Sequence, residues 1–264
     1  MAAIQYKYVN LSHGKTRYID AGSGEPVILI HGFPFQRSAD DWLPNVEALS
    51  AKFHVLAPDC MGWAPSDFLD QEYSFAYLTD FVREFQDAMG LHSSHIVGAS
   101  MGGWIAGILS YESPERVDKV IQTGHNGIGA RPNAGMMNWK PPSDDDIKVW
   151  LHEVGAGADV DLEGLVAERI QTAHQPGRVE AFAKLARHMG DGVTRTRYDM
   201  LRRMPQVKAP TLYVWGRTDA SFPASEQAVT LTPDARLTVL ECGHDVAILK
   251  PGEFNQAAVA FLSE

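Results

Sequence analysis

Three residues that lie far apart in the chain could together activate a hydroxyl group: Ser100, Asp219 and His244. A serine hydroxyl is a poor nucleophile near neutral pH, so an imidazole must accept its proton, and a carboxylate must orient that imidazole and stabilise its charged form. The three residues occur in the order nucleophile, acid, base, and each follows a run typical of a buried strand. We therefore predict a Ser-His-Asp triad at the ends of three strands.

The residues around the serine support its role as a nucleophile. Residues 98–102 read G-A-S-M-G and match the pattern G-x-S-x-G, which places a serine on a sharp turn between a strand and a helix. Glycines on both sides leave room for the neighbouring chain where the backbone is strained. The helix expected after the turn would direct its first N–H groups at the serine oxygen. We predict that the backbone N–H groups of Met101 and of Phe33, in the loop 31–34, form an oxyanion hole.

The elements that must position these residues alternate between strands and helices. Continuous apolar runs, typical of strands covered on both faces, are expected at 26–31, 53–59, before Gly98, and at 117–124, 211–216 and 236–241. Helical patterns lie between them. This alternation predicts an α/β fold with a doubly wound, mostly parallel sheet. Two exposed antiparallel strands, residues 6–11 and 16–20, are expected to form its edge.

The alternation is interrupted from about residue 127 to residue 205, where no buried strand is expected. Three helices are predicted there, the first capped by Ser143, the second over 161–175 and the third over 179–189. A helical insertion between two strands would lie over the carboxyl ends of the strands, where ligands bind. We therefore predict a core of residues 1–126 and 206–264, with a helical cap of residues 127–205 inserted after the sixth strand.

Two residues outside the triad are candidates for substrate contacts. Arg169 lies in the middle of the apolar face of the second cap helix. A buried charge needs a partner, so Arg169 either pairs with an acid of the fold or holds a substrate carboxylate or carbonyl. Its position alone leaves both possibilities open. His125, which follows the strand after the serine helix, either lines the pocket or makes a structural hydrogen bond.

The composition excludes several classes of protein. A formal net charge of -10 disfavours binding to nucleic acid or to an anionic membrane surface. The N-terminal residues show neither the basic segment nor the apolar core of a signal peptide, so we expect none, and no apolar run is long enough to span a membrane. Cys60 and Cys242 occur in no metal-binding pattern, so we expect no metal, no cofactor and a cytoplasmic location. The oligomeric state stays open, with a homo-oligomer as one option.

On these motifs the chain resembles the α/β-hydrolase superfamily, and it is most similar to the meta-cleavage-product hydrolases. These enzymes cut a carbon–carbon bond in ring-fission products of aromatic degradation. The resemblance to the meta-cleavage-product hydrolases lies in the predicted cap, at residues 165–170, 176–177 and 180–182. In that family an arginine at the place of Arg169 contacts the substrate, so the resemblance favours a substrate role for Arg169. We also expect His31, in the loop before Phe33, to contact the substrate.

The chain departs from the family at two positions of the substrate pocket. Ala99 stands where the family usually has Asn, and Asp245 stands where it usually has Trp. The loop with Phe33 is closer to that of epoxide hydrolases and dehalogenases, but these use an aspartate nucleophile, and Ser100 argues against their chemistry.

The resemblance implies a serine hydrolase that cleaves a C–C bond next to a ketone in a small keto-acid held by Arg169. Two alternatives remain. One is a carboxylesterase or lactonase that acts on a small ester, and the other is a ligand receptor that retains the fold without turnover.

Overall fold

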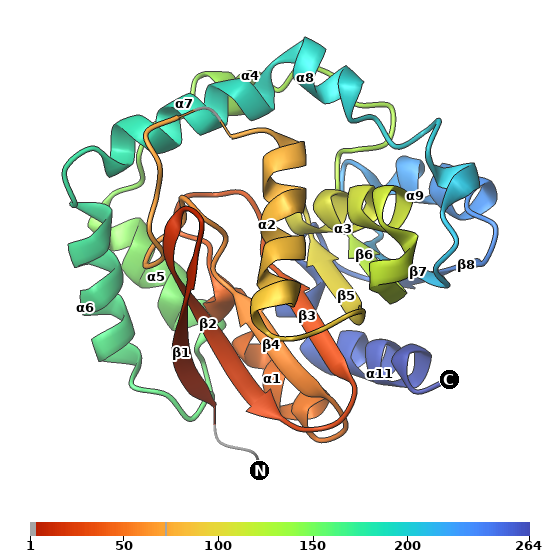
Figure 1. The fold of residues 1–264 in the computed structure, drawn as a ribbon, viewed down its shortest axis with the longest axis horizontal. Coiled ribbons are helices and arrows are strands. Elements are labelled where there is room, and N and C mark those ends of the chain that lie inside the picture. Colours follow the sequence, from red (N-terminus) through yellow and green to blue (C-terminus); the bar gives the residue numbers. More distant parts are fainter. Residues whose placement is uncertain (1–3, 72) are drawn as a thin grey trace.

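Eight strands form one sheet in the computed structural model, which describes residues 4–71 and 73–264. In spatial order the strands are β1 (Gln5–Leu11), β2 (Gly14–Gly22), β4 (His54–Pro58), β3 (Pro26–Ile30), β5 (Ser94–Ala99), β6 (Val117–Thr123), β7 (Thr211–Gly216) and β8 (Ala235–Leu240). The first two pairings are antiparallel, and the other five are parallel (Figure 1). The predicted doubly wound, mostly parallel sheet is confirmed.

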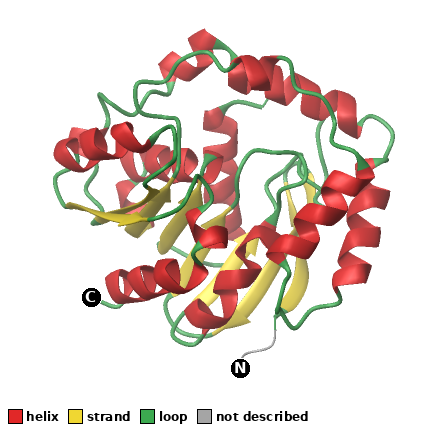
Figure 2. Cartoon of the chain, turned by 180° about the vertical axis from the view of Figure 1, so that it is seen from behind, coloured by secondary structure: helices red, strands yellow, loops and turns green. Residues whose placement is uncertain are grey.

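Helices cover both faces of the sheet because its central strands are apolar on both sides. In β3, residues 27–30 are fully buried, and alternate side chains enter two different cores. On one face, α2 (Phe75–Ala88) and α3 (Met101–Glu112) pack in front of the sheet in Figure 1. On the other face lie α1 (Leu43–Ser50) and α11 (Pro251–Leu262), seen from behind in Figure 2. The parallel strands therefore end at one common rim, where the predicted triad residues follow them.

The expectation of two exposed strands at the sheet edge is only half correct. β1 lies at the edge, but β2 lies between β1 and β4, and residues 16–19 of β2 are buried. Arg17 is buried there because its guanidinium pairs with Asp59 at 2.6 Å and with Asp40 at 2.7 Å. A charged residue in a short polar strand is usually exposed to solvent. Arg17 can be buried only because Asp40 and Asp59, which are distant in sequence, pair with it.

The segment between β6 and β7 contains helices and no strand. Its helices are α4 (Ala134–Met137), α5 (Asp144–Val154), α6 (Leu162–Ala173), α7 (Arg178–Gly190) and α8 (Gly192–Arg197). In Figure 1, α6, α7 and α8 form an arc around the left and upper side of the molecule. Helices α5, α6 and α7 correspond to the three predicted from the sequence, and α6 is shorter at both ends than the predicted 161–175. Ser143 caps α5 with a capping box, in which Ser143 and Asp146 bond each other's backbone N–H groups.

Short elements complete the described chain: η1 (Ala39–Trp42), η2 (Pro114–Arg116), η3 (Met204–Gln206), α9 (Phe222–Leu231) and α10 (Val246–Leu249). Within residues 4–71 and 73–264, no helix is both long and apolar enough to cross a bilayer. Among the same residues, no group of three or more His, Cys, Asp or Glu side chains could hold a metal ion.

Candidate active site

Ser100 lies on the sharp turn that its sequence pattern predicts. Its backbone has φ 53° and ψ −113°, and it is the one non-glycine residue with positive φ among those that the structure describes. The turn needs glycine on both sides. A Cβ atom on Gly98 would lie 2.1 Å from the carbonyl oxygen of Gly102, and one on Gly102 would lie 2.1 Å from that of Ile30. The strained serine therefore projects from the end of β5 at the first turn of α3.

The structure brings the three predicted triad side chains into one hydrogen-bonded row. His244 Nε2 lies 3.0 Å from Ser100 Oγ, and His244 Nδ1 lies 2.8 Å from Asp219 Oδ2. Asp219 follows β7, and His244 follows β8. With Nδ1–H donating to the carboxylate, Nε2 is left as the acceptor for the serine proton. This is the geometry that a serine nucleophile requires.

The charges of the row stabilise each other. Although burial disfavours its charged form, hydrogen bonds from His244 and Ser221 hold the pKa of Asp219 below its ordinary value. The hydrogen bond to Asp219 raises the pKa of His244, against the opposing effect of burial. The imidazole is therefore a better proton acceptor than a free histidine side chain.

Two further residues, which the sequence patterns did not indicate, hold Asp219 in place. The backbone N–H and the hydroxyl of Ser221 both donate to Asp219 Oδ1, at 2.8 and 2.9 Å. Trp215 Nε1 in turn donates to the Ser221 hydroxyl at 3.0 Å. A serine two residues after an aspartate is a known turn signal, so the pattern Asp-x-Ser could have indicated this contact.

The loop after β3 runs next to the serine. A Cβ atom on Gly32 would lie 3.5 Å from Ser100 Cβ, so the backbone passes close to the nucleophile. The indole Nε1 of Trp63 donates to the carbonyl oxygen of Phe33 at 2.8 Å and fixes the loop. The oxyanion hole from Phe33 and Met101 remains a prediction that this arrangement allows.

The structure gives His31 backbone partners where a substrate contact was expected. Its side chain is fully buried. Nε2 accepts a hydrogen bond from the Cys60 N–H at 3.0 Å, so Nδ1 carries the proton and donates to the carbonyl oxygen of Gly32 at 2.8 Å. Burial lowers the pKa of His31 to about 3. The neutral ring with both nitrogens paired shapes the loop beside Ser100.

Arg169 pairs with an acid of the fold, and the substrate role that the resemblance favoured is corrected. Its Nη2 lies 2.8 Å from Asp40 Oδ2, and its Nη1 donates to the carbonyl oxygens of Gln36 and Arg37 at 3.2 and 3.3 Å. Only 2% of Arg169 is exposed. A buried guanidinium binds whatever acceptors surround it, and these lie about 130 residues earlier in the chain, beyond the reach of pattern analysis.

Of the two roles considered for His125, lining the pocket or making a structural hydrogen bond, the structure shows the hydrogen bond. It is fully buried, and its Nδ1 accepts from the Gly127 N–H at 3.2 Å. Its ring meets that of Trp215 edge-on, with the centroids 5.3 Å apart. Burial first, and then the nearby charge of His244, lower the pKa of His125 to about 3. His125 therefore packs beside the triad as a neutral ring.

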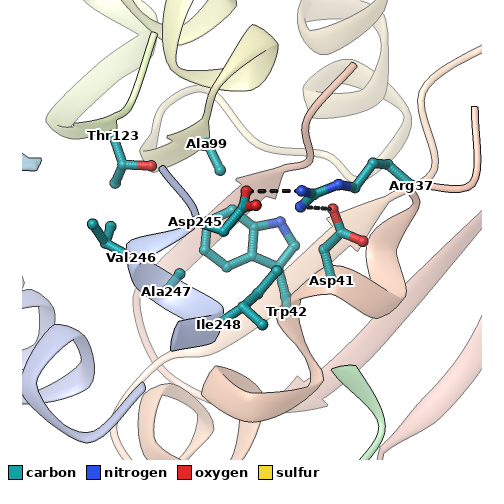
Figure 3. A pocket seen from close by; sticks show the side chains of 9 residues that line it. All are labelled: Arg37, Asp41, Trp42, Ala99, Thr123, Asp245, Val246, Ala247 and Ile248. Atoms are coloured by element: carbon teal, nitrogen blue, oxygen red, sulfur yellow. Dashed lines mark hydrogen bonds and ion pairs between the residues drawn. The ribbon is translucent and has the colours of Figure 1, made fainter. Parts of the chain in front are cut away.

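Ala99 and Asp245, the two positions where the chain departs from the family it resembles, line one cavity (Figure 3). The cavity is small, with a volume of about 10 Å³. Its other lining residues are Arg37, Asp41, Trp42, Thr123, Val246, Ala247 and Ile248. Asp245 pairs with Arg37 at 2.8 Å, and Arg37 pairs with Asp41 at 3.1 Å. The cavity is bordered by the residue that precedes the nucleophile and by the residue that follows the base.

Comparisons with known proteins agree with this architecture. The sequence model of the α/β-hydrolase fold matches residues 25–251. The 2-hydroxy-6-oxo-6-phenylhexa-2,4-dienoate hydrolase of Burkholderia cepacia is 31% identical over 96% of this chain and 93% of its own length. An acetyltransferase component of the acetoin cleaving system of Cupriavidus necator is 28% identical over 96% of this chain and 68% of its own length. The solved meta-cleavage product hydrolase of Pseudomonas fluorescens IP01 has a TM-score of 0.79 and 27% identity, with 97% of each chain covered.

Proposed function

Because this chain belongs to the α/β-hydrolase fold family, we propose that it is a serine hydrolase that cleaves a C–C bond next to a ketone in a ring-fission product of aromatic catabolism. The observation that carries the proposal is the row from Ser100 Oγ to His244 at 3.0 Å and from His244 to Asp219 at 2.8 Å. The names of the relatives from Burkholderia cepacia and Pseudomonas fluorescens support the cleavage of a C–C bond in a ring-fission product.

Each residue of the row has a role in this reaction. Ser100 Oγ adds to the ketone carbon while its proton passes to His244 Nε2. The N–H groups of Phe33 and Met101 stabilise the resulting oxyanion. The C–C bond then breaks, its electron pair leaves with the departing carbon, and that carbon takes the proton from His244. Water then adds to the acyl carbon while its proton passes to His244. The bond between the acyl carbon and Ser100 Oγ breaks, the serine oxygen takes the proton back from His244, and the acyl group leaves as a carboxylic acid.

A second candidate is a carboxylesterase or lactonase, which needs the same triad. One specific observation favours it. The cation expected to hold a keto-acid, Arg169, is bound to Asp40 at 2.8 Å instead. An ester or lactone without a carboxylate would need no such cation.

The two candidates are separated by comparing a yellow ring-fission dienoate, supplied as free acid and as methyl ester, with a p-nitrophenyl ester. Loss of the yellow colour, with mass spectrometry showing the two fragments, supports C–C hydrolysis. Rapid release of p-nitrophenol without bleaching of either dienoate form would favour the esterase. In both cases turnover must disappear in Ser100→Ala, whereas turnover that persists in this variant would contradict the role of the serine. A receptor without turnover would show neither reaction.

A further inference from the structure

Two loops of the candidate active site follow strands that do not pair with each other. The oxyanion loop, residues 31–38 after β3, contains Phe33, and the base loop, residues 241–245 after β8, contains His244. In the sheet, β5, β6 and β7 lie between β3 and β8, which puts the two strands four spacings, or about 19 Å, apart. The sheet by itself therefore holds the two loops together only through three intermediate strands.

A buried arginine joins the two loops directly. Arg37, of the oxyanion loop, pairs through Nη2 with Asp245 Oδ1 of the base loop at 2.8 Å and through Nη1 with Asp41 Oδ2 at 3.1 Å (Figure 3). The side chain of Arg37 is only 8% exposed, and that of Asp245 is 26% exposed. Asp245 directly follows His244 in the chain. The ion pair therefore attaches the base loop to the oxyanion loop at the residue next to the base.

Hydrogen bonds fix the backbone between Arg37 and Phe33. The N–H of Arg37 donates to the carbonyl oxygen of Pro34 at 2.8 Å and closes a four-residue turn. The carbonyl oxygen of Phe33 accepts from Trp63 Nε1 at 2.8 Å, and that of Arg37 accepts from Arg169 Nη1 at 3.3 Å. The position of the Arg37 guanidinium and that of the Phe33 N–H are therefore coupled.

The cap covers the guanidinium and limits its movement. The indole ring of Trp150, from α5, lies over the guanidinium of Arg37 at 3.8 Å, and its Nε1 donates to Asp41 Oδ1 at 3.0 Å. The cavity beside Arg37 has a volume of about 10 Å³, which is room for about one water molecule. Arg37 is thus held by a ring on one face and by a carboxylate at each terminal nitrogen.

We propose that Arg37 is a positioning residue of the reaction: through Asp245 it keeps the base loop, and with it His244, at the correct distance from the oxyanion donor of Phe33. The inference rests on the proposed function and deepens it. The serine proton must reach His244 Nε2 while the oxyanion lies about 3 Å from its donors, and a misplacement of about 1 Å lowers such a rate up to about 100-fold. Because the pair acts on the catalytic groups and not on the substrate, its loss should lower the rate without lowering the affinity.

A fluorophosphonate tests this role without knowledge of the substrate. Ser100 Oγ attacks phosphorus and forms a P–O bond, the P–F bond breaks, fluoride leaves with the bonding electrons, and the serine proton passes to His244. Mass spectrometry over time gives the maximal rate constant of labelling and the probe concentration that gives half of it. Each variant is measured at its own optimal pH, because Asp245 raises and Arg37 lowers the pKa of His244.

We expect Asp245→Ala to lower the maximal rate constant about tenfold or more and to leave the half-saturating concentration within about twofold of the wild-type value. Asp245→Asn, whose amide oxygen still accepts from Arg37, should stay within about threefold of the wild-type rate. Asp245→Ala should remain folded, since Arg37 keeps Asp41 as a partner, and urea denaturation checks this. Asp87→Ala, which breaks an exposed pair with Arg116, is the control and should label at the wild-type rate.

A double-mutant cycle tests whether the ion pair itself is responsible. Arg37→Met should lower the rate constant less in the Asp245→Ala background than in the wild type, because the pair that it breaks is already absent there. Equal effects of Arg37→Met in the two backgrounds would contradict the proposal.

The remaining outcomes separate the positioning role from the proposed function. Wild-type labelling rates in Asp245→Ala would overturn the positioning role, as would equal slowing in Asp245→Ala and Asp245→Asn. A higher half-saturating concentration at an unchanged maximal rate would make Asp245 a ligand contact and would overturn it too. If the probe failed to label Ser100 in the wild-type protein, the serine would not be a nucleophile, and the proposed function would fail together with the inference.

Discussion

The triad and the arginine network of the same molecule use similar charged hydrogen bonds in opposite ways. The triad is an open row that ends at a serine hydroxyl, and the side chain of its base, His244, is 34% exposed. The network around Asp40 is closed, because Asp40 accepts from both Arg17 and Arg169 and all three are buried. An open row can release and accept a proton, whereas a closed network fixes the cap helix α6 to the core. The comparison shows that the burial of a charged side chain and the number of its partners, more than its residue type, distinguish a group that can react from one that stabilises the fold.

The substitution with the largest expected effect removes the serine hydroxyl at the end of the open row. Ser100→Ala should lower kcat by roughly 10³-fold or more, because no other group of the row can form the acyl intermediate. The free energy of unfolding should change by less than about 1 kcal/mol, since the hydrogen bond between Ser100 and His244 is only partly buried. Steady-state kinetics and urea denaturation measure the two quantities. Near-normal turnover in this variant would show that the row is not catalytic.

The substitution with the next largest expected effect removes one arginine from the closed network. Arg169→Met should lower the free energy of unfolding by roughly 3 kcal/mol, because Asp40 loses one of its two buried cations. Urea denaturation measures the change. Arg187→Met, an exposed arginine of the neighbouring α7, is the control and should stay within about 0.5 kcal/mol of the wild type. If Arg169→Met kept full stability and raised only KM, the contrast between the two regions would fail.

A smaller effect is expected from the hydroxyl that holds the acid of the row. Ser221→Ala should lower kcat about tenfold with little change in KM, because Asp219 loses a donor that orients it towards His244. Ser221→Thr, which keeps the hydroxyl, should restore the rate. Ser225→Ala removes a hydroxyl of the following helix, α9, which donates to the Phe222 carbonyl, and it should leave kcat unchanged. A merely structural role for Ser221 would lower stability without this separation of kcat from KM.

The smallest effect concerns pH. His244 must be neutral to accept the serine proton, and its pKa is raised above 6.5, so kcat/KM should fall as the pH is lowered through a midpoint above that value. Asp245 contributes to the raised pKa, so Asp245→Asn should move the midpoint down by less than about one unit. A pH–rate profile with an uncharged ester tests both statements. A wild-type midpoint below 6.5 would contradict them.

Local patterns predicted the elements that need only neighbours in sequence. The G-x-S-x-G turn requires glycine at position 98 for a local reason, because a Cβ atom there would meet the carbonyl oxygen of Gly102. The clash at Gly102 is with Ile30 on the neighbouring strand β3 and depends on the fold. The triad could be predicted from its order and from the strand that precedes each member. The burial of β2 could not, because it depends on Asp40 and Asp59, which reach Arg17 only after the chain folds.

The sequence by itself determined the sheet, the strained serine and the order of the three triad residues, since apolar periodicity and glycine sterics act over short stretches of chain. The tertiary structure alone decided what the buried arginines Arg169 and Arg37 do. Arg169 is a cap anchor and Arg37 a pocket residue because carboxylates of distant segments occupy their nitrogens. A charge in a buried place is governed by whichever partners the fold brings within about 3 Å, and no local pattern encodes those partners.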